Sequence, residues 1–304
     1  MREYDKIRVD YYNNWPKVNK NEFKFVNIIE DSLRETKLEQ IILPVQLPMI
    51  VEENFQKNIS HLIDAFESLP YRPDFAFDTF WRIVDSYTTV RKINLSWNAG
   101  NITDSELLVD NIVLPVLQKS NTLKKAFDEL CNMIPTQAVE FVHKRSFGIS
   151  AGTIDIHQDD VNKRVRRALG IDLYNEIKNK YSKLGLQSQR DFSKLIHILF
   201  NSEAAIKINS DAEFILSEKN KFMFIKDGLL YSYRNERFHG NIFSPFRSSK
   251  VTLNTFSHPY YCCLFSYAII LFMMHEEFPL EIKLESIESN LNENINRFKQ
   301  VFIT

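Results

Sequence analysis

Glycine is scarce in this chain, and its scarcity limits the folds that the chain can adopt. Only 7 of the 304 residues are glycine, while 44% of them are hydrophobic. β-Sandwiches and α/β nucleotide-binding folds need glycine at tight turns and in phosphate-binding loops. The length and the apolar fraction are sufficient for a substantial core. We therefore predict a globular all-α protein.

Apolar residues recur at helical spacing along most of the chain. One such stripe consists of Phe55, Ile59, Leu62, Ile63 and Phe66, and it ends before Pro70. The prolines within residues 43–48 disfavour helix, so that segment is expected to be extended. Further helices are predicted over residues 73–87, 104–116, 121–133, 136–145, 158–168, 171–183, 189–201, 221–239 and 257–276.

Charge and cysteine content indicate a cytoplasmic protein. The formal net charge is −1, which argues against a protein that coats nucleic acid through bulk electrostatics. The three cysteines have no metal-ligand spacing, and Cys262 and Cys263 lie in an apolar stretch, as expected for reduced core residues. The first residues contain no apolar segment of a secretory signal. We expect a cytoplasmic location.

The longest uncharged apolar stretch runs from Pro259 to Met274. It is shorter than the roughly 20 residues that a membrane-spanning helix needs. We therefore predict a buried core helix and no contact with a membrane. Ser257 is the expected N-cap of this helix, with Pro259 in its first turn.

The segment 234–240, with the sequence RNERFHG, carries the most distinctive chemistry. Arg234 can hold a phosphate through a planar fork of donors and never loses its charge. His239 can transfer a proton near neutral pH, and the end of a helix favours its protonated form. Gly240 is a suitable residue for a left-handed helix C-cap. This combination is suited to phosphate-ester chemistry.

The segment resembles the signature of the HEPN superfamily, in which an arginine is followed by four to six residues and then a histidine. Here Asn235 follows the arginine, four residues separate Arg234 from His239, and a loop and an apolar helix follow. The resemblance covers residues 220–276. It implies a HEPN-type helical bundle with additional helices, over residues 71–280 with a helical insertion. A mixed N-terminal extension, 1–70, would precede it, and a C-terminal helix, 281–304, would follow.

The resemblance also implies a metal-independent endoribonuclease that needs no cofactor. Arg234 would bind the scissile phosphate, His239 would act as general acid or base, and Asn235 would orient the arginine or the phosphate. The RNA products would carry a 2′,3′-cyclic phosphate and a 5′-hydroxyl. Such proteins form homodimers with a composite active site and act as toxins or antiviral effectors, so an antitoxin or a defence-system protein is an expected partner.

Additional residues near the motif are candidates for binding RNA. They are Arg237, Arg247, Lys250 and the ring of Tyr231. The basic cluster 163–167 could contact RNA phosphates, but the favoured interpretation is the solvated face of a helix. Two alternatives stay open: a non-catalytic helical module that binds a nucleotide or a protein partner, and a structural role in which the arginines are solvated and His239 fills a helix end.

Overall fold

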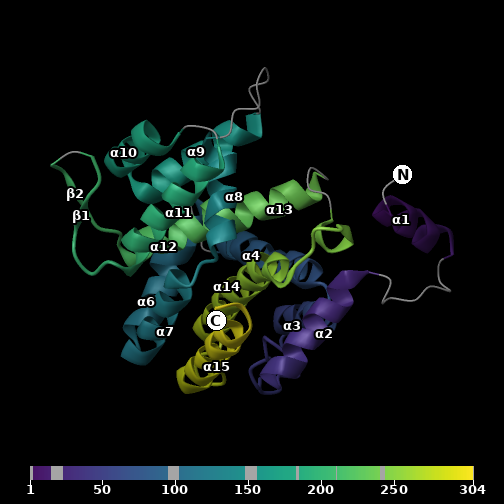
Figure 1. The fold of residues 1–304 in the computed structure, drawn as a ribbon. Helices are drawn as coiled ribbons and strands as arrows, with labels where there is room; N and C mark the ends of the chain where they lie inside the picture. The colour runs from purple at the N-terminus through teal and green to yellow at the C-terminus, as the bar shows by residue number, and fades with distance from the viewer. Residues whose placement is uncertain are drawn as a thin grey trace. The chain divides into compact units, whose positions relative to one another are not determined.

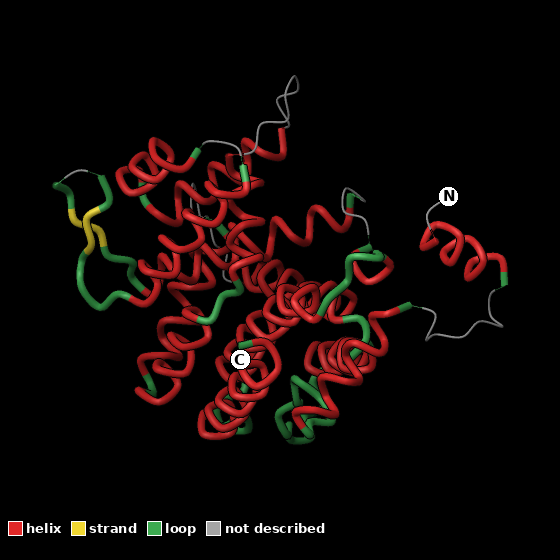
Figure 2. Tube along the Cα trace, viewed as in Figure 1, coloured by secondary structure: helices red, strands yellow, loops and turns green. Residues whose placement is uncertain are grey.

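The computed structural model has an all-α fold, which confirms the predicted fold class (Figures 1 and 2). It describes residues 3–14, 23–94, 103–147, 156–182, 185–209, 211–239 and 244–303. The α-helices are α1 Glu3–Asn13, α2 Lys24–Thr36, α3 Glu53–Glu67, α4 Pro73–Asn94, α5 Asp104–Leu108, α6 Leu114–Gln118, α7 Asn121–Asn132, α8 Thr136–Phe147, α9 Ile156–Leu169, α10 Ile171–Tyr181, α11 Leu186–Asn201, α12 Glu218–Met223, α13 Tyr231–Phe238, α14 Leu253–Glu277 and α15 Leu284–Phe302.

Shorter elements complete the description. Two π-helical segments, η2 Val109–Val113 and η3 Phe224–Leu230, lie between α-helices, and η4 Pro245–Arg247 is a 3₁₀ turn. The strands β1 Ile206–Lys207 and β2 Glu213–Phe214 form an antiparallel pair in which Ile206 faces Phe214. The predicted helices lie where apolar periodicity placed them, with ends that differ by a few residues.

The chain divides into two compact units, and the divisions fall inside α4, α13 and α14 and after Leu284, the first residue of α15. The first unit comprises Met1–Val84, Glu236–Ile270 and Glu285–Thr304, and the second comprises Asp85–Asn235 and Leu271–Leu284. Each unit therefore combines segments that are distant in the sequence. The predicted domain boundaries at residues 70 and 280 stay predictions.

In the first unit, aromatic rings pack the helices together. Polar side chains bind the backbone of residues 43–48, the segment that its prolines predict to be extended. The Phe66 ring contacts the rings of Phe80 and Tyr267, with centroids 5.7 Å and 5.4 Å away. The Tyr267 hydroxyl accepts a hydrogen bond from the Val45 amide at 2.7 Å. The fully buried Asn294 of α15 accepts from the Leu43 amide at 2.8 Å. These side chains replace the backbone partners that an extended segment lacks.

In the second unit, α8 packs against α9 and α11, and η3 packs against α8 and α9. Gly228 allows this close approach, because a Cβ atom there would lie 3.3 Å from Cγ2 of Val165 on α9. Residues 218–238 form one helical run, as predicted, but its middle is π-helical, a geometry that often occurs at functional sites.

The start of α14 differs from the prediction. The helix begins at Leu253, so Ser257 and Pro259 lie inside it, and the Ser257 hydroxyl donates to the Asn254 carbonyl at 2.9 Å instead of capping an amide. The prediction of Ser257 as N-cap was wrong because the helix begins about one turn earlier, where the Thr252 amide donates to the Thr255 hydroxyl at 3.0 Å. The apolar window of α14 is long enough to cross a membrane, but 94% of it is buried within the protein. That burial is typical of a core helix in a soluble protein.

Candidate functional site

The residues of the predicted motif lie on α13 and directly after it. Arg234 and Asn235 are half-buried residues of the helix, whereas His239 lies in the turn that follows and is exposed. The division between the compact units falls between Asn235 and Glu236. Gly240 and residues 241–243, which include the predicted C-cap, lie outside the described residues.

Arg234 contacts the residue that follows it in the motif. Its Nη1 donates a hydrogen bond to Oδ1 of Asn235 at 3.1 Å. The contact restricts the arginine side chain, whose planar guanidinium has the geometry to bind an anion through two donors. The role of Asn235 in orienting the arginine or the phosphate stays a prediction.

Arg164, from the basic cluster 163–167, binds the helical run that carries the motif. Its Nε donates to the Asp227 carbonyl at 3.0 Å, and its Nη2 donates to the Ser232 hydroxyl at 3.3 Å. The guanidinium also lies 4.7 Å from the ring centroid of Tyr231. Burial lowers the pKa of this arginine, yet the group stays charged at neutral pH. Arg164 is thus not the solvated residue that the pattern suggested, and it covers one face of Tyr231.

The other tyrosine of the segment, Tyr233, belongs to the core. It is buried, and its ring meets Phe141 edge-on at a centroid distance of 6.1 Å. Tyr231 is half-buried and is the better placed of the two to meet a nucleic-acid base.

A buried polar cluster lies in the π-helical segment that precedes α13. The Lys226 ammonium donates to the Ser105 hydroxyl at 2.7 Å, and that hydroxyl donates to Asp227. Lys226 and Asp227 are each 5% exposed and Ser105 is 2% exposed. A buried charge is tolerated only when it is paired and hydrogen-bonded, so this cluster restrains the π-helical segment.

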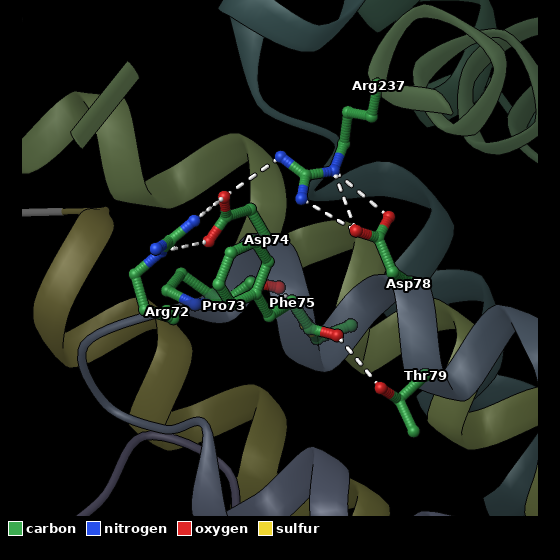
Figure 3. Close-up of polar contacts among 8 residues, drawn as sticks. Arg72, Pro73, Asp74, Phe75, Asp78, Thr79 and Arg237 are labelled. Atoms are coloured by element: carbon green, nitrogen blue, oxygen red, sulfur yellow. Dashed lines mark hydrogen bonds and ion pairs between the residues drawn. The ribbon is translucent and has the colours of Figure 1, made fainter. Parts of the chain in front are cut away.

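Arg237, a predicted RNA-binding residue, is held by two carboxylates of α4 (Figure 3). Its Nη2 donates to Oδ2 of Asp78 at 2.6 Å, and its Nη1 donates to Oδ2 of Asp74 at 2.9 Å. Asp74 also binds the Nε and Nη2 of Arg72, at 2.9 Å and 2.8 Å. The guanidinium of Arg72 stacks 3.4 Å from the centroid of the Phe75 ring. This cluster, the Arg237 network, anchors the end of α13 to α4.

The carboxylates of the Arg237 network were not predicted as site residues. Asp74 and Asp78 are four residues apart, so they occupy the same polar face of the predicted helix 73–87. That spacing is a signal for a shared cationic partner. The spacing does not identify which residue is that partner, because Arg237 is 159 positions after Asp78 in the chain.

Arg247 and Lys250 lie in different surroundings. The Arg247 guanidinium lies among aromatic rings, 4.2 Å from the centroid of Phe23 and 5.2 Å from that of Phe25. Burial lowers its pKa. Lys250 is exposed. Of these two predicted RNA contacts, Lys250 is open to a polyanion, whereas Arg247 is engaged in cation–π packing.

Comparisons of the chain with protein-family models, with curated proteins and with solved structures each give no match. The resemblance to the HEPN superfamily therefore rests on the motif and its helical context.

Proposed function

We propose that the protein is a metal-independent endoribonuclease of the HEPN type, acting in the cytoplasm as a toxin or an antiviral effector. The motif carries the proposal, and three observations support it. The chain is all-α, Arg234 is hydrogen-bonded to Asn235, and His239 is exposed at the end of α13. An exposed imidazole is available to a bulky polymer such as RNA, whereas a buried one is not.

The proposed reaction is an internal transesterification. The 2′-hydroxyl of a ribose loses its proton as its oxygen attacks the adjacent phosphorus. The bond from phosphorus to the 5′-oxygen breaks, and the departing 5′-oxygen takes up a proton. Arg234 neutralises the charge that develops on the non-bridging oxygens, and His239 transfers a proton. The products are a 2′,3′-cyclic phosphate and a 5′-hydroxyl. Two chains would pair in a homodimer, so that both motifs line one composite cleft.

Incubation of purified protein with total RNA and with tRNA in excess EDTA tests this proposal. Wild type is expected to cleave, and His239→Ala and Arg234→Gln are expected to reduce the rate by about a hundredfold or more, a typical loss for a general acid or an electrostatic group. Matched controls are His61→Ala, a half-exposed histidine of α3, and Arg34→Gln, whose side chain is 76% exposed. Both controls should retain full activity.

End-group analysis of the fragments completes the test. Resistance to 5′-phosphate-dependent exonuclease and labelling by polynucleotide kinase are expected for 5′-hydroxyl ends. Equal cleavage by wild type and His239→Ala would contradict the proposed site. Binding of RNA or nucleotide without cleavage, weakened by Arg234→Gln, would instead support the non-catalytic module.

A further inference from the structure

The second compact unit contains a pocket of about 760 Å³ that is separate in sequence from the motif. Residues of α6, α7 and α12 line it, together with the two residues before α12. This volume lies within the usual range of small-molecule sites. Its chemistry is unusual, because four of the lining residues are lysines: Lys124, Lys125, Lys219 and Lys221.

The lysines outnumber the carboxylates of the pocket, which are Asp128 and Glu218. Glu218 pairs with Lys124 at 2.8 Å, and this ion pair raises the pKa of the lysine. Asp128 pairs with Lys221 at 2.6 Å. Both carboxylates are therefore neutralised within the pocket, and two further ammonium groups remain in the lining.

Those two groups differ in their surroundings. Lys219 pairs with Asp110 at 2.6 Å, a carboxylate that is not part of the lining. Lys125 is exposed, and it forms no ion pair with any residue in the described part of the chain. The lining thus has an excess of positive charge that Asp110 offsets only in part.

Lys221 is a firmly held lysine of the pocket, and Asp128 balances its charge. Its side chain is only 8% exposed, and its ammonium is held by Asp128 and by the Asn132 side chain at 3.3 Å. A lysine held in this way loses little further side-chain entropy when an anion binds near it. Lysines on an ordinary solvated face are mobile, and they do not surround a concave volume.

We infer that this pocket binds the phosphate groups of a small polyphosphate ligand, either a nucleoside triphosphate or a free polyphosphate. Each ammonium carries three donors, whereas a triphosphate offers many acceptors and several negative charges. Leu114 and Leu216 supply an apolar part of the lining, against which a nucleoside would pack. The inference does not depend on the proposed ribonuclease activity.

Isothermal titration of the full chain with ATP, tripolyphosphate and adenosine, at low and high salt, tests the inference. Saturable binding of ATP or of tripolyphosphate that weakens with added NaCl is expected, with no binding of adenosine. Lys125→Glu should weaken the affinity by about tenfold or more, which is the loss of one charge-assisted contact, and Lys125→Gln should weaken it less. Lys194→Glu is the matched control, because this lysine of α11 lies outside the pocket and its side chain is 73% exposed.

The outcomes separate the two ligand sources. Comparable affinity for both polyanions would indicate that phosphates alone are recognised, whereas about tenfold tighter binding of ATP would indicate that the nucleoside is also bound. Absence of saturable binding by either polyanion would overturn the inference. Equal losses in Lys125→Glu and Lys194→Glu, or binding of adenosine as tight as that of ATP, would overturn it as well. Circular dichroism of each variant checks that the fold is intact.

Discussion

Replacement of Arg237 by methionine tests whether this residue is structural or contacts RNA. The guanidinium has an 11% exposed side chain and bonds both Asp78, at 2.6 Å, and Asp74, at 2.9 Å. Methionine preserves much of the apolar stem but removes every donor. Asp78, whose side chain is 17% exposed, would then lose this cationic partner. Asp74, whose side chain is 1% exposed, would keep its ion pair with Arg72.

The expected loss of stability follows from these contacts. Breaking a buried ion pair by removing one partner costs roughly 3–5 kcal/mol, because the remaining charge stays buried. Asp74 keeps its two hydrogen bonds from Arg72, so the lower end of that range applies. We therefore expect the free energy of unfolding to fall by about 3 kcal/mol, which lowers the melting temperature by about 5 °C for a chain of this size.

Urea denaturation followed by far-ultraviolet circular dichroism measures this effect. Arg34→Met is the matched control, because this arginine is 76% exposed and pairs with Asp31 at 3.2 Å on the surface. Its loss should change the free energy of unfolding by less than about 1 kcal/mol. In a double-mutant cycle, Arg237→Met and Asp78→Asn should show a strong coupling energy.

Unchanged stability of the variant would contradict a structural role for Arg237. If Arg237→Met unfolds at the same urea concentration as wild type and as Arg34→Met, the Arg237 network does not anchor α13. If the same variant also lost affinity for RNA, Arg237 would be a substrate contact, as the sequence pattern predicted. Loss of both stability and RNA binding would indicate that the anchor shapes the binding surface.

Substitutions at three further residues test other parts of the fold. Burial lowers the pKa of His258 from 6.5 to about 3, so below pH 6.5 the unfolded chain binds a proton that the folded chain excludes. This contribution to the free energy of unfolding is complete above pH 6.5 and decreases by about 2 kcal/mol by pH 5. In urea denaturation at pH 7 and pH 5, His258→Gln should therefore lose less stability between the two pH values than wild type does. Gly228→Ala should change the free energy of unfolding by less than about 1 kcal/mol, because the higher helix propensity of alanine offsets the close contact of 3.3 Å with Val165. Gly228→Val should cost about 2 kcal/mol more, and thermal melts of both variants measure the difference. Arg164→Lys should lose about 1–2 kcal/mol in a urea titration, because one ammonium cannot reproduce the forked contacts of the guanidinium, and Arg166→Lys should have little effect.

The helices themselves were predictable from the sequence, because helix formation depends on neighbours three and four positions apart. The stripe of Phe55 and Leu62 identifies α3, the prolines of residues 43–48 identify the extended segment, and the uncharged stretch after Pro259 identifies the buried helix α14. Low glycine content correctly indicated an all-α fold. The catalytic roles of Arg234 and His239 stay predictions from the motif.

The tertiary structure alone decided which partners the charged side chains have. Arg237 could not be matched to Asp74 and Asp78 from sequence, because these residues lie far apart along the chain and meet only after α13 packs near α4. The same holds for Arg164, whose cluster has the spacing of a solvated face, and for the lysines of the pocket, which come from separate helices. Local backbone hydrogen bonds select a helix, but the burial and pairing of a charge depend on what the fold brings beside it.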